Sequence, residues 1–347
     1  MDEDDAGTAS APHQWAGLLP WQHDAARAAL AGRARWPHAL LLTGREGIGK
    51  RALALEFARA LLCEAARADG SACGECAGCR YVAARQHPDL RLVEPVEVDD
   101  EGAATPVPWI TVAHIRALIE WAQLTSHRRM AKVAVIAPAE RMNAAAANAL
   151  LKTLEEPPAG TYLLLVSHQP GRLPATVRSR CRALAAPFPE PEAARAWLAE
   201  QGVGEPDALL SQAGGAPLAA LALDVPGYQS ERAVWLAALA SPKGLEPVAL
   251  AARIDTAPRE MRKERLAAAI DWLSAWCADI AAARAGDAPR HNVDHARAIA
   301  TLGPTVALVP LFRYYQSLAR ARAQIAHPLT PRLVAEALLF DYLDLFR

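Results

Sequence analysis

The segment Gly44-Arg45-Glu46-Gly47-Ile48-Gly49-Lys50 constrains the fold of this chain more than any other, because it fits the phosphate-loop pattern G-x-x-x-x-G-K. It follows a short apolar run at residues 39–43 and precedes a helical pattern from Lys50 to about Leu62, which is the strand–loop–helix setting such a loop requires. Glycines let backbone N–H groups surround phosphate oxygens, and the helix N-terminus and the lysine add positive charge. The alternative is a glycine-rich turn without a ligand. The candidate nucleotide ligands are Gly44, Gly47, Gly49 and Lys50.

The groups that would bind Mg²⁺ beside this loop are missing. Arg51 stands where an active loop carries Ser or Thr, and a guanidinium has no lone pair for a metal. The predicted buried strand at 132–137 runs into Ala137-Pro138 without a carboxylate, and Glu140 is poorly spaced to replace one. Since nothing then orients the metal or the attacking water, we expect no ATP hydrolysis. Whether the loop still binds nucleotide stays open.

Four cysteines crowd into 17 residues, with the spacing Cys63-x9-Cys73-x2-Cys76-x2-Cys79. Glycines at 74 and 78 allow the backbone to wrap around one ion, and four thiolates make a closed, structural zinc site. Two disulfides or an iron–sulfur cluster are the alternatives. The acidic N-terminus lacks the apolar core of a secretory signal, and in an unsecreted protein such a cluster favours zinc.

The length of 347 residues predicts two or three domains. Alternating strand and helix patterns as far as Pro187 indicate an α/β domain with a parallel sheet, and only helical patterns follow. Residues 94–108 are expected to be a polar linker. No stretch approaches the ~20 apolar residues that cross a bilayer. A net charge of −1 argues against a chain that coats nucleic acid by itself. On one face of each of two C-terminal helices, apolar residues gather at 308, 311, 312, 315 and 318, and at 334, 338, 342 and 345.

Two further motifs, Asn148 to Pro158 (NALLKTLEEPP) and Leu173 to Cys181 (LPATVRSRC), resemble the AAA+ clamp-loader subunits of bacterial DNA polymerase III. The resemblance is strong over residues 18–190 and weak beyond them. It implies a RecA-like AAA+ P-loop domain with an inserted four-cysteine zinc module, a small helical lid and an all-α collar. The expected boundaries are a disordered tail at 1–14, the AAA+ domain at 15–188 with its zinc module at 63–79, the lid at 189–227 and the collar or oligomerisation domain at 228–347.

Within that family the motor subunits keep the Ser or Thr and the acidic pair that this chain lacks. The arginine that senses nucleotide from the lid is also missing from residues 214–219. The pattern therefore resembles the delta-prime branch, whose members act as the non-hydrolysing stator. The resemblance implies that Arg180 of Ser179-Arg180-Cys181 reaches a neighbour's ATP as an arginine finger in trans, although Arg178 stands close by.

The resemblance also implies partners: the gamma/tau motor subunits, the delta subunit, and the sliding clamp and primed DNA through the assembled complex. It implies a cytoplasmic, nucleoid-associated location and no membrane contact. The alternative functions are an ATP-hydrolysing gamma/tau-like motor subunit, a zinc-dependent nucleic-acid-binding protein, and a scaffold that ignores nucleotide. The few cations among residues 63–80, Arg67 and Arg80, disfavour the second.

Overall fold

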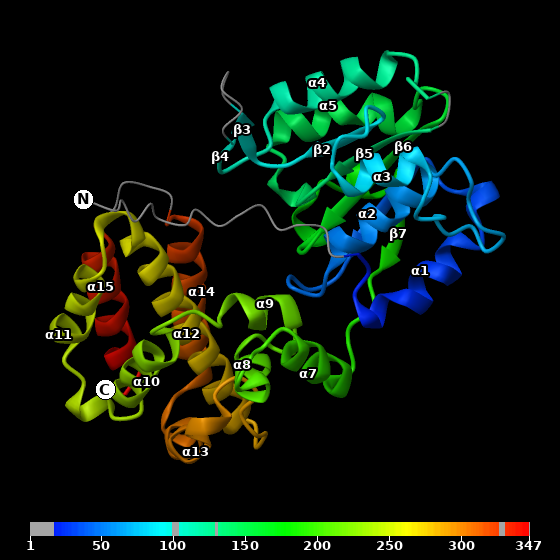
Figure 1. Ribbon diagram of the computed structural model, residues 1–347. Coiled ribbons are helices and arrows are strands. Elements are labelled where there is room, and N and C mark those ends of the chain that lie inside the picture. The colour runs from blue at the N-terminus through cyan, green and yellow to red at the C-terminus, as the bar shows by residue number, and fades with distance from the viewer. Residues whose placement is uncertain (1–16, 99–103, 129–130, 326–329, 347) are drawn as a thin grey trace, which may run out of the picture. The chain divides into compact units, whose positions relative to one another are not determined.

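The computed structural model describes residues 17–98, 104–128, 131–325 and 330–346, and it forms two compact units that divide after Ala193 (Figure 1). The predicted tail at 1–14 lies outside the described residues. The first unit is α/β and the second is helical throughout its described residues, as the sequence predicts. The finer boundaries at residues 188 and 227 stay predictions.

A five-stranded parallel sheet in the order β2-β5-β6-β1-β7 forms the centre of the first unit. The three inner strands are continuous apolar runs buried on both faces, which is why the sequence predicts them. The two edge strands were not predicted, because each is short and carries an arginine. The strands are β1 (Ala39–Thr43), β2 (Leu90–Val93), β5 (Lys132–Ile136), β6 (Thr161–Ser167) and β7 (Arg182–Ala185).

Helices cover both faces of the sheet. The helix that follows the phosphate loop, α2, packs on β1, β5 and β6 beside α1 and α3. Helices α4 and α5 lie on the other face (Figure 1). Apolar side chains of that face, such as Leu41 and Leu163, pack with those of α4, α5 and α6. The helices of this unit are α1 (His23–Leu30), α2 (Lys50–Leu61), α3 (Ala77–Ala83), α4 (Val112–Gln123), α5 (Ala144–Glu155) and α6 (Ala175–Arg178).

The segment at 94–108 departs from the linker that the sequence predicts. It contains β3 (Val96–Val98) and β4 (Ala104–Pro106), which pair antiparallel, while residues 99–103 between them are not described. His114 of α4 ties this hairpin to the domain, because its Nε2 lies 3.0 Å from the carbonyl oxygen of Val96. The strands have few apolar side chains in alternation, so periodicity gave no signal for them.

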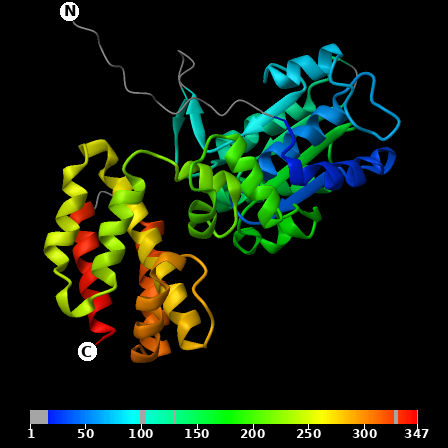
Figure 2. The same cartoon turned by 60° about the horizontal axis from the view of Figure 1, so that its bottom comes forward.

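The second unit is a bundle built around the long helix α12, which contacts α10, α13, α14 and α15 (Figure 2). Residues 259–284 are apolar enough to cross a membrane by length and composition, but half of that window is buried in the bundle. Its side chains, including Trp276 and Ile280, form the core instead. The helices are α7 (Pro191–Glu200), α8 (Pro206–Gln212), α9 (Pro217–Ala222), α10 (Tyr228–Leu239), α11 (Pro247–Ala252), α12 (Arg262–Arg284), α13 (Ala296–Leu302), α14 (Leu308–Ala323) and α15 (Pro331–Asp344).

The apolar face expected on α14 is divided between core and surface. Leu311 and Leu318 are buried, as predicted, but Leu308, Phe312 and Tyr315 are 42%, 54% and 44% exposed. The apolar arc of α14 is thus wider than the strip that the bundle covers, and helical periodicity alone did not separate its covered residues from its exposed ones. On α15, in contrast, Leu338 and Tyr342 are buried as expected.

Candidate functional site

The phosphate loop lies where the sequence predicts it, between β1 and the first residue of α2. Gly47 and Gly49 have φ values of +80° and +89°, which side chains rarely adopt. A Cβ on Gly49 would lie 2.2 Å from Leu19 Cδ1, so the loop also needs glycine for close packing. The segment before α1 covers the loop: Trp21 Nε1 donates to the Ile48 carbonyl oxygen at 3.0 Å, and Gln22 Nε2 donates to that of Gly49 at 2.8 Å.

Lys50 is buried inside this arrangement, with 2% of its surface exposed, and its Nζ donates to the carbonyl oxygen of Arg45 in the same loop. Burial lowers the pKa of Lys50 from 10.5 to about 8, although the charges of Glu140 and Glu46 oppose the shift. The lysine that would neutralise a phosphate is therefore turned onto its own loop and desolvated.

Arg51, which replaces the metal-binding Ser or Thr, forms an ion pair with Glu94 just after β2, with Nη2 and Oε2 2.8 Å apart. The pair links the start of α2 to the residue after β2, and the side chain at position 51 has no hydroxyl. At the end of β5, Ala137 and Pro138 supply no carboxylate, as the sequence shows. The described residues at these two positions thus offer no ligand for Mg²⁺.

Three further polar residues, Glu140, Ser167 and His168, were not predicted as site residues from the sequence. Glu140 accepts the backbone N–H groups of His168 and Gln169 at 2.8 and 3.1 Å through Oε1. Burial and the charge of Lys50 lower the pKa of His168. Glu140 Oε2, Ser167 Oγ and His168 Nδ1 are buried polar atoms that bond to no described residue. Ser167 ends β6, and Glu140 and His168 follow β5 and β6, at the edge that holds the phosphate loop; this position is the signal that could have found them.

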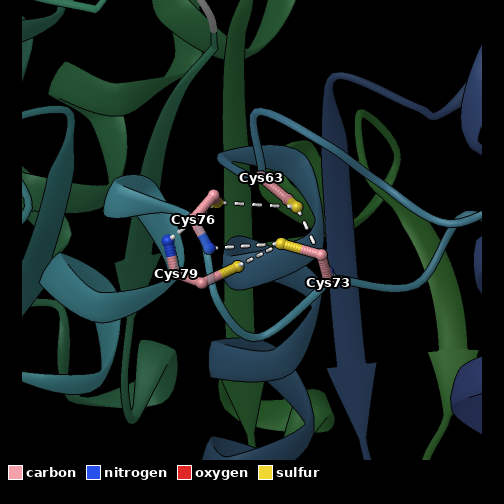
Figure 3. A group of neighbouring side chains, drawn as sticks. All are labelled: Cys63, Cys73, Cys76 and Cys79. Atoms are coloured by element: carbon pink, nitrogen blue, oxygen red, sulfur yellow. Dashed lines mark hydrogen bonds between the residues drawn. The ribbon is translucent and has the colours of Figure 1, made fainter.

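The four cysteines form one cluster, and all of their sulfur atoms lie within 4.8 Å of one another (Figure 3). Sγ of Cys63 lies 3.9 Å from that of Cys76, and Sγ of Cys73 lies 3.9 Å from that of Cys79. Zn–S bonds of about 2.3 Å in a tetrahedron give sulfurs roughly 3.8 Å apart, so the cluster fits such an ion. Free thiols at these distances are not disulfides.

Local structure explains why the cluster closes. Cys63 comes directly after α2, while Cys76 caps α3 and accepts the N–H of Cys79 at 3.4 Å. A Cβ on Gly78 would meet the Leu62 carbonyl oxygen at 2.6 Å, so glycine is needed where α3 approaches α2. Backbone N–H groups of Cys76 and Glu75 lower the pKa of Cys73 to about 6, which favours the thiolate that a metal binds, whereas burial raises the pKa of Cys63 and raises that of Cys79 to about 12.

Arg180 lies in the short connection between α6 and the edge strand β7, and its side chain is about one-third exposed. Its Nε donates to Glu155 Oε1 at 2.6 Å, its Nη2 forms an ion pair with the same oxygen, and its Nη1 donates to the Thr176 carbonyl oxygen at 2.9 Å. Glu155 is the last residue of α5, which Pro157 and Pro158 follow. The neighbouring Arg178 is exposed and forms no ion pair among the described residues.

The three predicted sets of residues therefore occupy distinct parts of the first unit: the loop before α2, the cluster after α2, and the connection after α6. In the second unit Gly214 and Gly215 precede α9, and residues 214–219 carry no arginine, as expected.

Comparisons with known proteins agree on one family. The family described as "DNA polymerase III, delta subunit" matches residues 27–189. The DNA polymerase III subunit delta' of Pseudomonas aeruginosa is 45% identical over 222 residues, which are 63% of this chain and 65% of that protein. The subunit delta' of Yersinia pestis is 34% identical over 302 residues, 84% of each chain. The tau subunit of Salmonella typhimurium is 36% identical over 144 residues, which are 42% of this chain and 21% of that protein.

Proposed function

The chain belongs to the family of bacterial DNA polymerase III delta' subunits, and we propose that it serves there as the non-hydrolysing stator of the clamp loader. One observation carries the proposal: the loop that should hold Mg²⁺·ATP is closed on itself, while Arg180 stands partly exposed on the connection before β7. The chain then completes a neighbour's catalytic site without having one of its own.

The chemistry of Arg180 and the chemistry of the phosphate loop both support this proposal. Phosphoryl transfer spreads negative charge over the γ-phosphate oxygens, and a guanidinium supplied in trans stabilises that charge. At its own loop the chain offers an ion-paired Arg51 in place of a hydroxyl and a buried Lys50 bonded to Arg45, so hydrolysis there is not expected. Binding of nucleotide by Gly44, Gly47, Gly49 and Lys50 without hydrolysis is the remaining question, and equilibrium binding of ATP to the isolated chain answers it.

Partners follow from the family. The proposed neighbours are the gamma/tau motor subunits and the delta subunit, with the sliding clamp and primed DNA reached through the assembly, in the cytoplasm at the nucleoid. The exposed apolar strip of α14, formed by Leu308, Val309, Phe312 and Tyr315, supports a subunit contact through a collar at residues 228–347. In the same proposal, residues 189–227 are the lid and Zn²⁺ fills the cysteine cluster as a structural ion.

Reconstitution tests the proposal. The chain is mixed with gamma/tau and delta subunits, and ATPase stimulated by the clamp and primed DNA is measured. Because a trans arginine contributes 10³–10⁵-fold in related phosphoryl transfers, Arg180→Ala should lower the rate by about 10³-fold or more at the site it serves. The total rate should fall less, since other sites keep their own fingers.

The matched control is Arg178→Ala, two residues away, exposed and without an ion pair among the described residues. It should leave the rate unchanged. Gel filtration must show that both variants assemble. An unchanged rate with Arg180→Ala in an intact complex refutes the finger, and phosphate release by the isolated wild-type chain would instead favour a gamma/tau-like motor subunit.

A further inference from the structure

Among the described residues, Glu155 is the charged group that contacts Arg180. Its Oε1 accepts Nε at 2.6 Å and also pairs with Nη2, so one carboxylate oxygen holds one whole edge of the guanidinium. The third nitrogen, Nη1, is held by the Thr176 carbonyl oxygen at 2.9 Å and lies 3.3 Å from Ser179 Oγ. All three nitrogens are thus held by the chain itself, and the plane of the group is fixed.

This arrangement matters because a long side chain at the surface is otherwise free to rotate. Arginine has many side-chain rotamers, and an unrestrained finger would lose this freedom each time it engaged a phosphate. Two anchors on different elements, Glu155 on α5 and Thr176 on α6, remove much of that freedom beforehand. Arg180 remains about one-third exposed, so the held group stays accessible to a partner.

We propose that Glu155 is a positioning residue that holds Arg180 in the orientation in which it meets the neighbouring subunit's ATP. The inference rests on the proposed trans role of Arg180. Glu155 itself need not touch the nucleotide: it binds the Nε edge, fixes the plane of the guanidinium and offsets its charge until the γ-phosphate approaches. Its effect on the reaction should therefore depend entirely on Arg180.

The competing explanation is an ordinary surface ion pair. Such pairs contribute little to stability and nothing to catalysis, and the Glu155 side chain is about half exposed. Under that explanation removal of the carboxylate leaves ATP turnover unchanged. Glu156, the next residue, is also exposed and forms no ion pair among the described residues, so it provides a matched control on the same helix end.

The experiment uses the reconstituted loader with clamp and primed DNA, and compares Glu155→Gln with Glu156→Gln. Misplacing a catalytic group by about 1 Å can cost 10²-fold, so Glu155→Gln should lower kcat at the served site by about tenfold. KM for ATP should not change, because the nucleotide is bound by the neighbour's own phosphate loop. Glu156→Gln should leave both constants unchanged. Unaltered kcat in Glu155→Gln, or a change confined to KM, overturns the proposal.

Combining Glu155→Gln with Arg180→Ala separates the two hypotheses. If Glu155 acts through Arg180, the double variant is as slow as Arg180→Ala alone. A further tenfold loss in the double variant shows that Glu155 acts by another route and overturns the positioning role. If Arg180→Ala alone has no effect, the trans finger fails first. If Arg180→Ala is slow while Glu155→Gln is normal, only the positioning role fails. Equal melting temperatures of the isolated chains exclude misfolding as the cause.

Discussion

Arg51 and Arg180 invite comparison, because each pairs with a glutamate and each is about one-third exposed. Arg51 is the second residue of α2, at the sequence position where an active phosphate loop has Ser or Thr, and it pairs with Glu94. Arg180 follows the four-residue helix α6 and pairs with the last residue of α5. Similar pairs thus stand in different settings: one lies at the start of the helix that follows the phosphate loop, and the other lies on the connection before an edge strand. Exposure alone does not distinguish them; the neighbouring elements do.

Loss of the cysteine cluster should have the largest effect on stability. The test asks whether the part of the first unit around α2 depends on a metal and whether the region around Arg180 does not. Cys76→Ser should reduce zinc from about one ion per chain to almost none. The first unit should lose several kcal/mol of stability, since structural zinc supplies on the order of 10 kcal/mol in small zinc-binding peptides. Elemental analysis and thermal unfolding measure the two effects.

The control for this variant is Cys277→Ser, in the buried core of the second unit, which should retain the ion even if it lowers stability. A wild-type preparation that is fully folded without metal would contradict the zinc site. In assembled loaders, the ratio of rates between wild type and Arg180→Ala should be the same with and without Cys76→Ser. A change in that ratio would show that the two regions are coupled.

Lys50 provides the next largest expected effect on stability. Its charge is buried in the phosphate loop, whereas the charge of Arg180 is about one-third exposed. The pKa of Lys50 is about 8 in the folded chain and near 10.5 when unfolded, so the folded state binds the proton less tightly. The loss of folding stability caused by burying the charged Lys50 is complete below pH 8, and it disappears as the pH rises to 10.5. Stability should therefore rise across this window by about 3 kcal/mol, at 1.36 kcal/mol per pKa unit.

Lys50→Met should remove this rise and stabilise the chain at pH 7, because the side chain keeps its length and loses its charge. Urea unfolding of wild type and Lys50→Met between pH 7 and 10 measures the difference in their free energies of unfolding. The contributions of titrating cysteines and tyrosines are the same in both proteins and cancel in this difference. The exposed Lys152→Met serves as the control and should follow the wild-type curve. Parallel curves for wild type and Lys50→Met would mean that Lys50 is as well solvated as an ordinary surface lysine.

What the sequence predicts well is local. The phosphate loop, the cysteine cluster and the inner strands predicted at 39–43 and 132–137 are each defined by neighbouring residues, and the structure contains all of them, with the second strand ending at Ile136. The edge strands β2 and β7 were not predicted, because an edge strand is half solvated and needs no continuous apolar run. The apolar arc on α14 misled for a related reason: periodicity identifies an apolar face but not what covers it.

The partners of charged residues could not be predicted, because they join segments far apart in the chain. Glu94 is 43 residues from Arg51, and Glu155 is 25 residues from Arg180. Lys132 shows the same limit: it is the charged first residue of β5, but it is buried and its Nζ lies 4.5 Å from the ring centre of Trp121. Only the folded arrangement of strands and helices reveals which carboxylate or ring each cation meets.

The variant with the smallest expected effect tests the comparison of the two arginines most directly. It places at position 51 the hydroxyl that an active loop would have. Arg51→Thr removes the pair with Glu94, which should change stability by no more than about 1 kcal/mol, as for other partly exposed pairs. Phosphate release by the isolated chain should remain at the background rate, because Ala137 and Pro138 still supply no carboxylate to hold Mg²⁺ or orient water. Steady-state phosphate release and denaturant unfolding measure both. If the single change produces turnover, the contrast between the two arginines rests on one side chain, and the loss of the acidic residues after β5 is not what silences the loop.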